Sequence, residues 1–552
     1  MLWCQVVLYQ DYVVNDPVTL NISDHNGVPL YGKKDKKASS ASSGLSATGK
    51  VMLFLCIMMA FMFVIYTSTT KFNRENSVPR TQTQNKLKDT VKEEPVSSTN
   101  KKSKIKPQNR MSQESKANKE KKTVDPKNTY DRSIAKELNK GMALLDKQKV
   151  EDALRYFRQL VEEHPKSPLA LYGKAVALDK LADQRRSNDL LQECIQNYRK
   201  IPELPDCPAE LKKIALVRMA GRLSFLGRMR QAAAALEKVA SLFPSDVKVL
   251  KDLGVQYLMY GNNQDAEKVF KKVLKLNPGS GFAKSHLGFA LKVQLHYQEA
   301  IPFLIEGVTS GDPGADDGRF YFHLGDALTR TGKPEEANKW YADAARKGIF
   351  LSAMQRSLYN ADTSLTAKPW WTPEETGYAE ELRKLEKNWH VIREEGLAIM
   401  DQKSGGFIPE EENLRDTGDW KQFTLYQQGR KQVANCRKTP RTCAIMDTIP
   451  DAIGCKRGQV KFSVMLPGTH VWPHTGPTNC RLRSHLGLVI PDNVFIRVGT
   501  ATKTWQEGKV IIIDDSIDHE VWHNGTSFRL IFIVDFWHPE LTPRQRATLT
   551  PI

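Results

Sequence analysis

The sequence repeats itself with a period of 34 residues across the middle of the chain. Ala232, Ala266 and Ala300 stand 34 residues apart, and Gly254 and Gly288 keep the same spacing. Each period carries the apolar pattern of amphipathic helices. A unit of this length holds a pair of helices that cannot bury their apolar faces alone, so the period restricts this part of the chain to a stack of helix pairs.

The most regular unit also has a recognisable signature. Leu253–Tyr257 reads Leu-Gly-Val-Gln-Tyr, and Ala266, Phe270 and Pro278 follow it. This pattern resembles tetratricopeptide repeats, in which small residues let the two helices of a unit approach closely. We expect the array to cover residues 129–365 and to form a concave surface suited to a protein or peptide ligand.

The first 128 residues have a different composition. An uncharged window runs from Val51 to Thr70, which is long enough to cross a bilayer as one helix. We therefore expect a cytosolic segment at 1–50, a signal-anchor transmembrane helix at 51–70 and a disordered basic linker at 71–128. The linker holds 16 Lys/Arg and 7 Asp/Glu, an excess of 9 that makes up half of the net charge of +18. Half of the positive charge is therefore attributed to a solvated linker, and nucleic acid is not expected as a partner.

The C-terminal part, residues 366–552, is rich in histidine, and from Gly418 onward it consists of β-branched runs separated by Gly, Pro and Asn turns. This composition predicts an all-β double-sheet domain, a double-stranded β-helix of the jelly-roll or cupin kind. Ahead of the strands, Pro373 opens a helix with acidic residues in its first turn, and we expect this helix to continue to about Met400. The chain is thus expected to be multidomain.

A metal site is indicated by His474 and His519, since imidazole suits first-row metals and a two-histidine site with open positions is typical of non-haem Fe(II) oxygenases. Arg529 begins the apolar run that follows the turn signal Asn524-Gly525. We expect the strands of His519 and Arg529 to pair antiparallel, which would bring the guanidinium toward the metal. A fork-shaped cation there fits a dicarboxylate such as 2-oxoglutarate.

The usual carboxylate of an iron triad is missing, because Thr475 and Gly476 follow His474. Asp515 either hydrogen-bonds water in the vacant third position or is an ordinary turn residue. His519-Glu520-Val521-Trp522-His523 matches the zinc-protease motif H-E-x-x-H. That motif requires a helix, whereas this segment lies between a strand-like run and a turn, so the match is interpreted as accidental.

Two smaller features of the sequence indicate the cellular compartment. Cys436 and Cys443 flank a short loop and could close a disulfide ring in an oxidising compartment, although two free thiols remain the alternative. Asn524-Gly525-Thr526 is a glycosylation sequon, which is compatible with a lumenal glycoprotein.

Several motifs of the C-terminal part closely resemble the aspartyl/asparaginyl β-hydroxylases: Lys461–Val464, Pro467–Arg483, His485 and Ser527–Phe532. The resemblance implies an endoplasmic reticulum membrane protein of type II with a lumenal catalytic domain. It also implies a peptide-aspartate β-dioxygenase that uses Fe(II), 2-oxoglutarate and O2 to hydroxylate Asp or Asn in epidermal-growth-factor-like domains. The Cys436–Cys443 pair matches a disulfide of this family. The short basic linker departs from the acidic, calcium-associated region of longer members, so calcium binding is not carried over.

The resemblance also implies a role for each site residue. His474 and His519 bind iron; Trp420, Ser463, His485 and Arg529 hold 2-oxoglutarate; Arg483, with Arg481 beside it, receives the carboxylate of the substrate. The first alternative is a catalytically silent repeat scaffold at the endoplasmic reticulum membrane, and the second, which the sequence favours least, is a zinc protease. The sequence leaves open the substrate protein, the preference for Asp or Asn, the oligomeric state and the use of the sequon.

Overall fold

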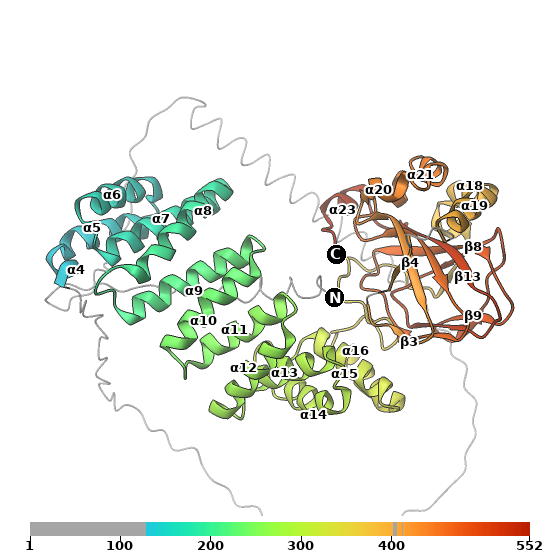
Figure 1. The fold of residues 1–552 in the computed structure, drawn as a ribbon, viewed down its shortest axis with the longest axis horizontal. Coiled ribbons are helices and arrows are strands. Elements are labelled where there is room, and N and C mark those ends of the chain that lie inside the picture. Colours follow the sequence, from blue (N-terminus) through green and yellow to red (C-terminus); the bar gives the residue numbers. More distant parts are fainter. Residues whose placement is uncertain (1–128, 401–405, 411) are drawn as a thin grey trace, which may run out of the picture. The chain divides into compact units, whose positions relative to one another are not determined.

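The structure is a computed structural model that describes residues 129–400, 406–410 and 412–552. An array of helices is followed by a β-rich domain (Figure 1). The segment 1–50, the expected transmembrane helix at 51–70 and the linker at 71–128 lie outside the described residues. Among the helices that are described, none is both long enough and apolar enough to cross a membrane.

The array confirms the prediction of stacked helix pairs. The periodic glycines lie where partner helices touch, since a Cβ at Gly254 would be 2.6 Å from the ring of Phe270 and one at Gly288 would be 2.6 Å from Leu304. Larger side chains there would force the paired helices apart. The helices are α4 (Thr129–Ser133), α5 (Ala135–Asp146), α6 (Val150–Glu163), α7 (Pro168–Arg185), α8 (Asn188–Lys200), α9 (Ala209–Phe225), α10 (Met229–Leu242), α11 (Val247–Met259), α12 (Asn263–Leu276), α13 (Gly281–Val293), α14 (Tyr297–Val308), α15 (Gly318–Arg330) and α16 (Pro334–Arg346).

The single helix expected between Pro373 and Met400 is wrong, because the structure has three helices there: α17 (Pro373–Thr376), α18 (Ala379–Lys387) and α19 (Trp389–Met400). Gly377 ends α17 in the left-handed conformation, with φ at +72°. Asn388 ends α18, where its side-chain amide donates a hydrogen bond to the carbonyl oxygen of Lys384 at 2.8 Å. Both residues commonly end helices, but the apolar pattern continues through them and therefore predicts one long helix.

The strands form two sheets in which neighbouring strands pair antiparallel. The larger sheet has the order β1-β11-β8-β13-β6-β4-β2, with β5 beside β4, and the smaller sheet has the order β10-β9-β12-β7-β3. Their bounds are β1 (Trp370–Trp371), β2 (Ile408–Pro409), β3 (Arg415–Thr417), β4 (Trp420–Gln427), β5 (Arg430–Lys431), β6 (Gln459–Met465), β7 (Thr469–His474), β8 (Arg481–Val489), β9 (Val494–Val498), β10 (Ala501–Lys503), β11 (Val510–Ile513), β12 (His519–His523) and β13 (Arg529–Trp537).

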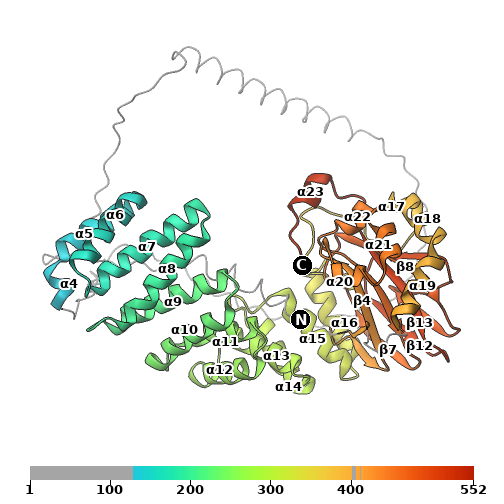
Figure 2. The ribbon, with the colours of Figure 1, turned by 45° about the horizontal axis from the view of Figure 1, so that its top comes forward.

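The central strand β13 is buried on both faces, and its side chains alternate between two layers of the domain. Helices α18 and α19 lie beside the large sheet (Figure 2). Leu530, Phe532 and Val534 pack into an outer core with helices α18 and α19 and the short helices that follow β5. Ile531 and Ile533 point the other way, into an inner core shared with the smaller sheet. The domain therefore has helices on one face of the large sheet and the small sheet on its other face.

The expected disulfide is present: Cys436 is bonded to Cys443. The two cysteines lie in α20 (Val433–Cys436) and α21 (Pro440–Met446), and two further short helices are α22 (Pro450–Ile453) and α23 (Pro543–Thr548).

The segment after α16 contacts the β-rich domain through buried polar groups. Arg356 forms an ion pair with Asp518, and both side chains are almost entirely buried. Gln355 donates a hydrogen bond from its side-chain amide to the hydroxyl of Ser516 at 2.8 Å. Asp518 and Ser516 belong to the loop that leads into β12, so this segment supports the beginning of the strand that carries His519.

Candidate functional site

His474 and His519 are brought together by the pairing of β7 with β12, in which they are direct cross-strand partners. Their ring centroids are 4.1 Å apart. Each Nδ1 lies within hydrogen-bond distance of a backbone carbonyl oxygen, that of Trp472 at 2.7 Å and that of Ile517 at 2.9 Å. A carbonyl oxygen only accepts, so each Nδ1 carries the proton, and the Nε2 lone pairs are left for a metal ion.

Both imidazoles are held in the neutral form that binds metals. Burial, together with the neighbouring His474, lowers the pKa of His519 to about 3. Burial likewise lowers the pKa of His474. In the part of the chain that the structure describes, no group of three or more His, Cys, Asp or Glu residues could hold an ion. Two neutral imidazoles that face each other are ligands suited to a first-row metal such as iron.

The alternation of side chains along β8 places its polar residues between the two sheets. Arg481, Arg483 and His485 share one face of the strand, whereas Leu482 and Leu486 on the other face belong to the outer core. A cavity between the sheets is lined by Trp420, Ser463, His474, Arg483, His485, His519 and Arg529, together with apolar residues of the inner core. Arg481 and Asp515 do not line this cavity.

Arg529 lines the cavity, but its strand pairs with other strands than expected. Its strand, β13, pairs with β6 and β8 in the large sheet, whereas β12 of His519 pairs with β7 and β9 in the small sheet. The expected antiparallel pairing of these two strands is wrong, because the chain crosses from one sheet to the other at residues 524–528 instead of forming a hairpin. Since the two sheets face each other, Arg529 and His519 still line the same cavity.

The charge of Arg529 has no acidic counterpart among the described residues. Its side chain is buried, with the residue only 2% exposed, and its Nη2 donates to the hydroxyl of Ser463 at 3.0 Å. Its Nε has no hydrogen-bond partner within the described ranges. Burial lowers the pKa of Arg529 to about 9. A buried cation without a carboxylate is costly, so this arrangement favours binding of an anion.

Ser463 and Trp420 complete one side of this anion site. The Ser463 oxygen accepts hydrogen bonds from the indole N–H of Trp420 at 2.9 Å and from Arg529 at 3.0 Å. A hydroxyl oxygen has two lone pairs, and these two donors occupy both of them. Ser463 can therefore only donate its own proton, which suits an anion.

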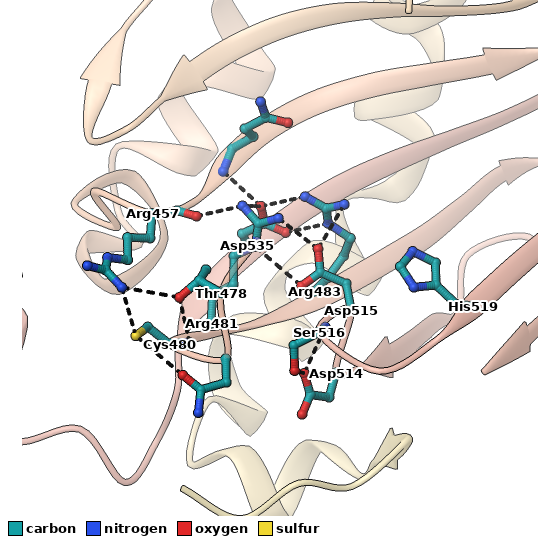
Figure 3. A network of polar contacts seen from close by, with 12 residues as sticks. Arg457, Thr478, Cys480, Arg481, Arg483, Asp514, Asp515, Ser516, His519 and Asp535 are labelled. Carbon is teal, nitrogen blue, oxygen red and sulfur yellow. Dashed lines mark hydrogen bonds and ion pairs between the residues drawn. The ribbon is translucent and has the colours of Figure 1, made fainter. Parts of the chain in front are cut away.

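Arg481 and Arg483 are held in a buried cluster with Asp515 and Asp535 (Figure 3). Arg483 donates to both oxygens of Asp535, at 2.7 and 2.9 Å, and Arg481 donates to Asp515 at 2.7 Å. Arg483 is also 3.1 Å from Asp515. Burial raises the pKa of the Asp515 carboxyl, but the two guanidinium groups outweigh it and hold that pKa well below its usual range. The two cations and two anions balance each other. Unlike Arg529, the two arginines of this cluster therefore have acidic partners.

Two residues of the site were not found from the sequence. Asp535 is a lone acidic residue in the apolar run of β13, and a charge in such a run is a signal of a buried ion pair. Trp505 donates its indole N–H to Nδ1 of His485 at 3.3 Å and lies under the guanidinium of Arg529, 5.0 Å from its ring centroid. Nothing in the sequence distinguishes it from the other tryptophans.

The H-E-x-x-H match is accidental, as expected, because residues 519–523 form strand β12. Positions four apart in a strand are separated by about 13 Å, too far to share an ion. His470 is also not part of the cavity lining; its ring nitrogens contact Asp416 at 3.0 Å and Glu520 at 2.9 Å.

Comparison with known proteins identifies both parts of the chain. Residues 386–539 match the family model "Aspartyl/Asparaginyl beta-hydroxylase", and residues 138–183 and 219–281 match "Tetratricopeptide repeat". The chain is 54% identical over 440 residues to "Aspartyl/asparaginyl beta-hydroxylase" of Homo sapiens, a match that covers 80% of this chain and 58% of that protein. The mouse protein of the same name is 54% identical over 426 residues, covering 77% of this chain and 57% of its own length.

A shorter relative matches only the β-rich part. "Aspartate beta-hydroxylase domain-containing protein 2" of Xenopus tropicalis is 38% identical over 174 residues, covering 30% of this chain and 47% of that protein. The chain spans less than two thirds of the length of the human and mouse relatives. The cavity nevertheless lies wholly within residues 386–539, and by the match of these residues this domain of the chain belongs to the aspartyl/asparaginyl β-hydroxylase family.

Proposed function

We propose that this chain is a 2-oxoglutarate- and Fe(II)-dependent dioxygenase that hydroxylates the β-carbon of Asp or Asn in epidermal-growth-factor-like domains. The observation that carries this proposal is the charge of Arg529, which has no acidic partner among the residues that the structure describes, in the same cavity as His474 and His519. A ligand that carries a carboxylate and can also bind a metal would satisfy both features at once. 2-Oxoglutarate is such a ligand, since it has a carboxylate at one end and a 2-oxo acid at the other.

The residues of the cavity divide between the two ligands. His474 and His519 would hold Fe(II), and Arg529, Ser463, His485 and Trp420 would hold 2-oxoglutarate. When bound, these ligands supply the oxidising power, drawn from O2, that inserts one oxygen atom into a C–H bond. The chain itself positions the reactants and excludes water, because the cavity lies between two sheets and is otherwise lined by apolar side chains such as Ile531 and Ile533.

Arg483 is proposed to receive the carboxylate of the substrate. It lines the cavity, whereas Arg481 lies behind it in the cluster with Asp515 and Asp535. An incoming carboxylate would share the Arg483 guanidinium with Asp515, and Arg481 would continue to neutralise that aspartate. Asp515 is accordingly proposed to orient the arginine pair rather than to serve as an iron ligand.

The two-sheet domain is proposed to be a double-stranded β-helix of the jelly-roll or cupin kind. Its strand orders and facing sheets support this, as does the position of the cavity between them. The repeat array is proposed to bind the protein substrate, as stacked helix pairs commonly bind protein or peptide ligands.

We further propose that the protein is a single-pass, type II protein of the endoplasmic reticulum membrane with its catalytic domain in the lumen. The uncharged window at 51–70 and the Cys436–Cys443 disulfide support this proposal, since disulfides persist in oxidising compartments. Protease added to intact microsomes should remove only the segment of about 50 residues ahead of the window. Digestion of the repeats and the β-rich domain would reverse the topology.

The test of the activity is incubation of the purified chain with Fe(II), 2-oxoglutarate and a disulfide-bonded growth-factor-like peptide, followed by mass spectrometry. We expect a gain of one oxygen on Asp or Asn together with formation of succinate. Peptide binding without succinate would favour the scaffold, and peptide cleavage would favour the protease. A variant in which both His474 and His519 are replaced by Ala is the control for background oxidation.

A further inference from the structure

Trp505 lines a hollow on the surface and also contacts two residues that line the inner cavity. It lies in the loop between β10 and β11, is only 2% exposed, and helps to line an open hollow together with Ile490 and Phe495. Its indole N–H meets Nδ1 of His485 at 3.3 Å, and the guanidinium of Arg529 lies 5.0 Å from its ring centroid.

The contact with His485 determines which nitrogen of the imidazole carries the proton. An indole N–H can only donate, so Nδ1 of His485 must accept and cannot itself be protonated. The proton of the ring is therefore on Nε2, which is buried and has no hydrogen-bond partner in the described part of the chain. A doubly protonated ring would place an N–H on Nδ1 directly against the indole N–H. The geometry thus leaves His485 as a neutral ring with one donor available to the cavity.

Ser463 is likewise left only as a donor, because both lone pairs of its hydroxyl oxygen accept hydrogen bonds, from Trp420 and from Arg529. Ser463, His485 and Arg529 then offer only donors to the cavity. A site made only of donors matches a carboxylate, which only accepts. The indole N–H of Trp505 leaves His485 as a donor, and that of Trp420 contributes to the same effect at Ser463.

We propose that Trp505 is a positioning residue for the 2-oxoglutarate site, where its N–H fixes His485 as an Nε2–H donor and its ring supports the Arg529 guanidinium. This inference rests on the proposed function, because 2-oxoglutarate is the anion for which the donors are arranged. The two contributions are separable. Trp505→Phe removes the N–H and retains an aromatic face for the cation.

A double-mutant cycle on the full chain tests the proposal by initial rates at varied 2-oxoglutarate. Trp505→Phe should raise the KM for 2-oxoglutarate by about three- to tenfold, the effect of losing one neutral hydrogen bond, with little change in kcat. In the His485→Ala background the same substitution should change KM less than about twofold, because the ring on which Trp505 acts is gone. An unchanged KM in the single variant, or the full effect persisting in the double variant, would overturn the proposal.

The matched control is Trp370→Phe. The indole Nε1 of Trp370 is buried without a hydrogen-bond partner among the described residues, so this variant removes an N–H that orients nothing. Its KM should equal that of the unmodified chain. A rise as large as that of Trp505→Phe would show that KM responds to any loss of packing, which would also reject the proposal.

Nuclear magnetic resonance of the ¹⁵N-histidine-labelled chain without metal gives a readout that does not depend on turnover. The His485 signals, identified by their loss in His485→Ala, should show an unprotonated Nδ1 and a protonated Nε2. Trp505→Phe should shift them toward a mixture of the two tautomers. The opposite tautomer in the unmodified chain would overturn the inference. A correct tautomer in a chain that consumes no 2-oxoglutarate would instead reject the proposed function alone.

Discussion

The carboxylate of Asp515 occupies the space that a side chain at Gly476 would require. A Cβ at position 476 would lie 2.7 Å from the Cγ of Asp515 and 2.7 Å from one of its oxygens. The backbone N–H of Gly476 also donates to the carbonyl oxygen of Asp515 at 2.6 Å. This contact gives a physical reason why the position two residues after His474, where an iron triad would have its carboxylate, is a glycine.

Gly476→Asp should therefore fail to create a third metal ligand. The new side chain would collide with Asp515 and place a second carboxylate beside it, at a cost of about 1–3 kcal/mol for overpacking alone. We expect a lower melting temperature and at least a tenfold loss of turnover. Gly279→Asp is the control, since a Cβ there would lie at an ordinary 3.7 Å from Asn277. Tighter Fe(II) binding with retained turnover in Gly476→Asp would contradict this account.

His519→Ala and His523→Ala should differ in metal binding although both remove buried imidazoles from β12. His519 faces His474, whereas Nδ1 of His523 accepts a hydrogen bond from the N–H of Gly525 at 3.2 Å. We expect His519→Ala to abolish calorimetric binding of Mn(II) and turnover. His523→Ala should keep both while losing about 2–4 kcal/mol of stability through the cavity left behind. Equal loss of metal binding in the two variants would restore the H-E-x-x-H interpretation.

Arg529 and Arg483 should act on different ligands. Removal of a charge-assisted contact costs about 1.5–3 kcal/mol, or roughly 10- to 150-fold in affinity. Arg529→Ala should weaken 2-oxoglutarate by this factor, and Arg483→Ala should chiefly weaken the peptide. Each ligand is titrated against each variant by calorimetry with Mn(II) and by initial rates. The assignment is wrong if Arg483→Ala weakens 2-oxoglutarate as much as Arg529→Ala does.

Arg529→Met should stabilise the chain when no 2-oxoglutarate is present. Burial lowers the pKa of Arg529 from 12.5 to about 9, which corresponds to at most about 5 kcal/mol. Because the folded pKa is the lower one, the charged group destabilises the fold at every pH below 9, and this effect decreases only as pH rises from 9 toward 12.5. Thermal unfolding at pH 7.5 measures the gain. Arg199→Met, at an exposed position, should change stability by less than about 0.5 kcal/mol.

Cys443→Ser should lower stability without affecting the metal site. The disulfide closes a short loop between positions separated by 7 residues, so its loss should cost about 2–3 kcal/mol. Neither cysteine lines the cavity, and Mn(II) binding should be unchanged. Reductant should lower the melting temperature of the unmodified chain by the same amount and leave the variant unaffected. A reductant effect on the variant would point to another cause.

The helical repeats could be predicted because their signal is local and periodic, and the proximity of His474 and His519 was also anticipated. A 34-residue period identifies helix pairs without knowledge of their contacts, as the packing of Phe270 against Gly254 illustrates. His474 and His519 stood out because histidines within β-branched runs are uncommon. The two histidines and Arg529 pointed to an Fe(II) oxygenase and to a dicarboxylate such as 2-oxoglutarate, and the resemblance of the longer motifs implied the roles of Trp420, Ser463 and His485.

Strand pairing and the partners of the arginines could not be predicted. The turn signal at Asn524-Gly525 favours a hairpin equally well whether the next strand stays in the same sheet or crosses to the other one, as it does here. Arg481 and Arg483 looked free to bind substrate because their partner Asp535 lies 52 residues beyond Arg483 and only the sheet brings it near. Contacts of this kind depend on register, which a single sequence does not contain.

The ion pair of Arg356 with Asp518 affects how fragments of this protein should be made. A catalytic fragment that began at residue 366, the domain boundary expected from the sequence, would lack Arg356. Asp518, immediately before His519, would keep only Arg497 of its two cationic partners. Loss of one member of a buried ion pair typically costs about 3–5 kcal/mol, and the cost should be smaller here because Arg497 stays 2.8 Å from Asp518. Such a fragment should express poorly or lose its metal, and one that begins ahead of Gln355 should not. The catalytic unit thus starts within the segment that leaves the repeats.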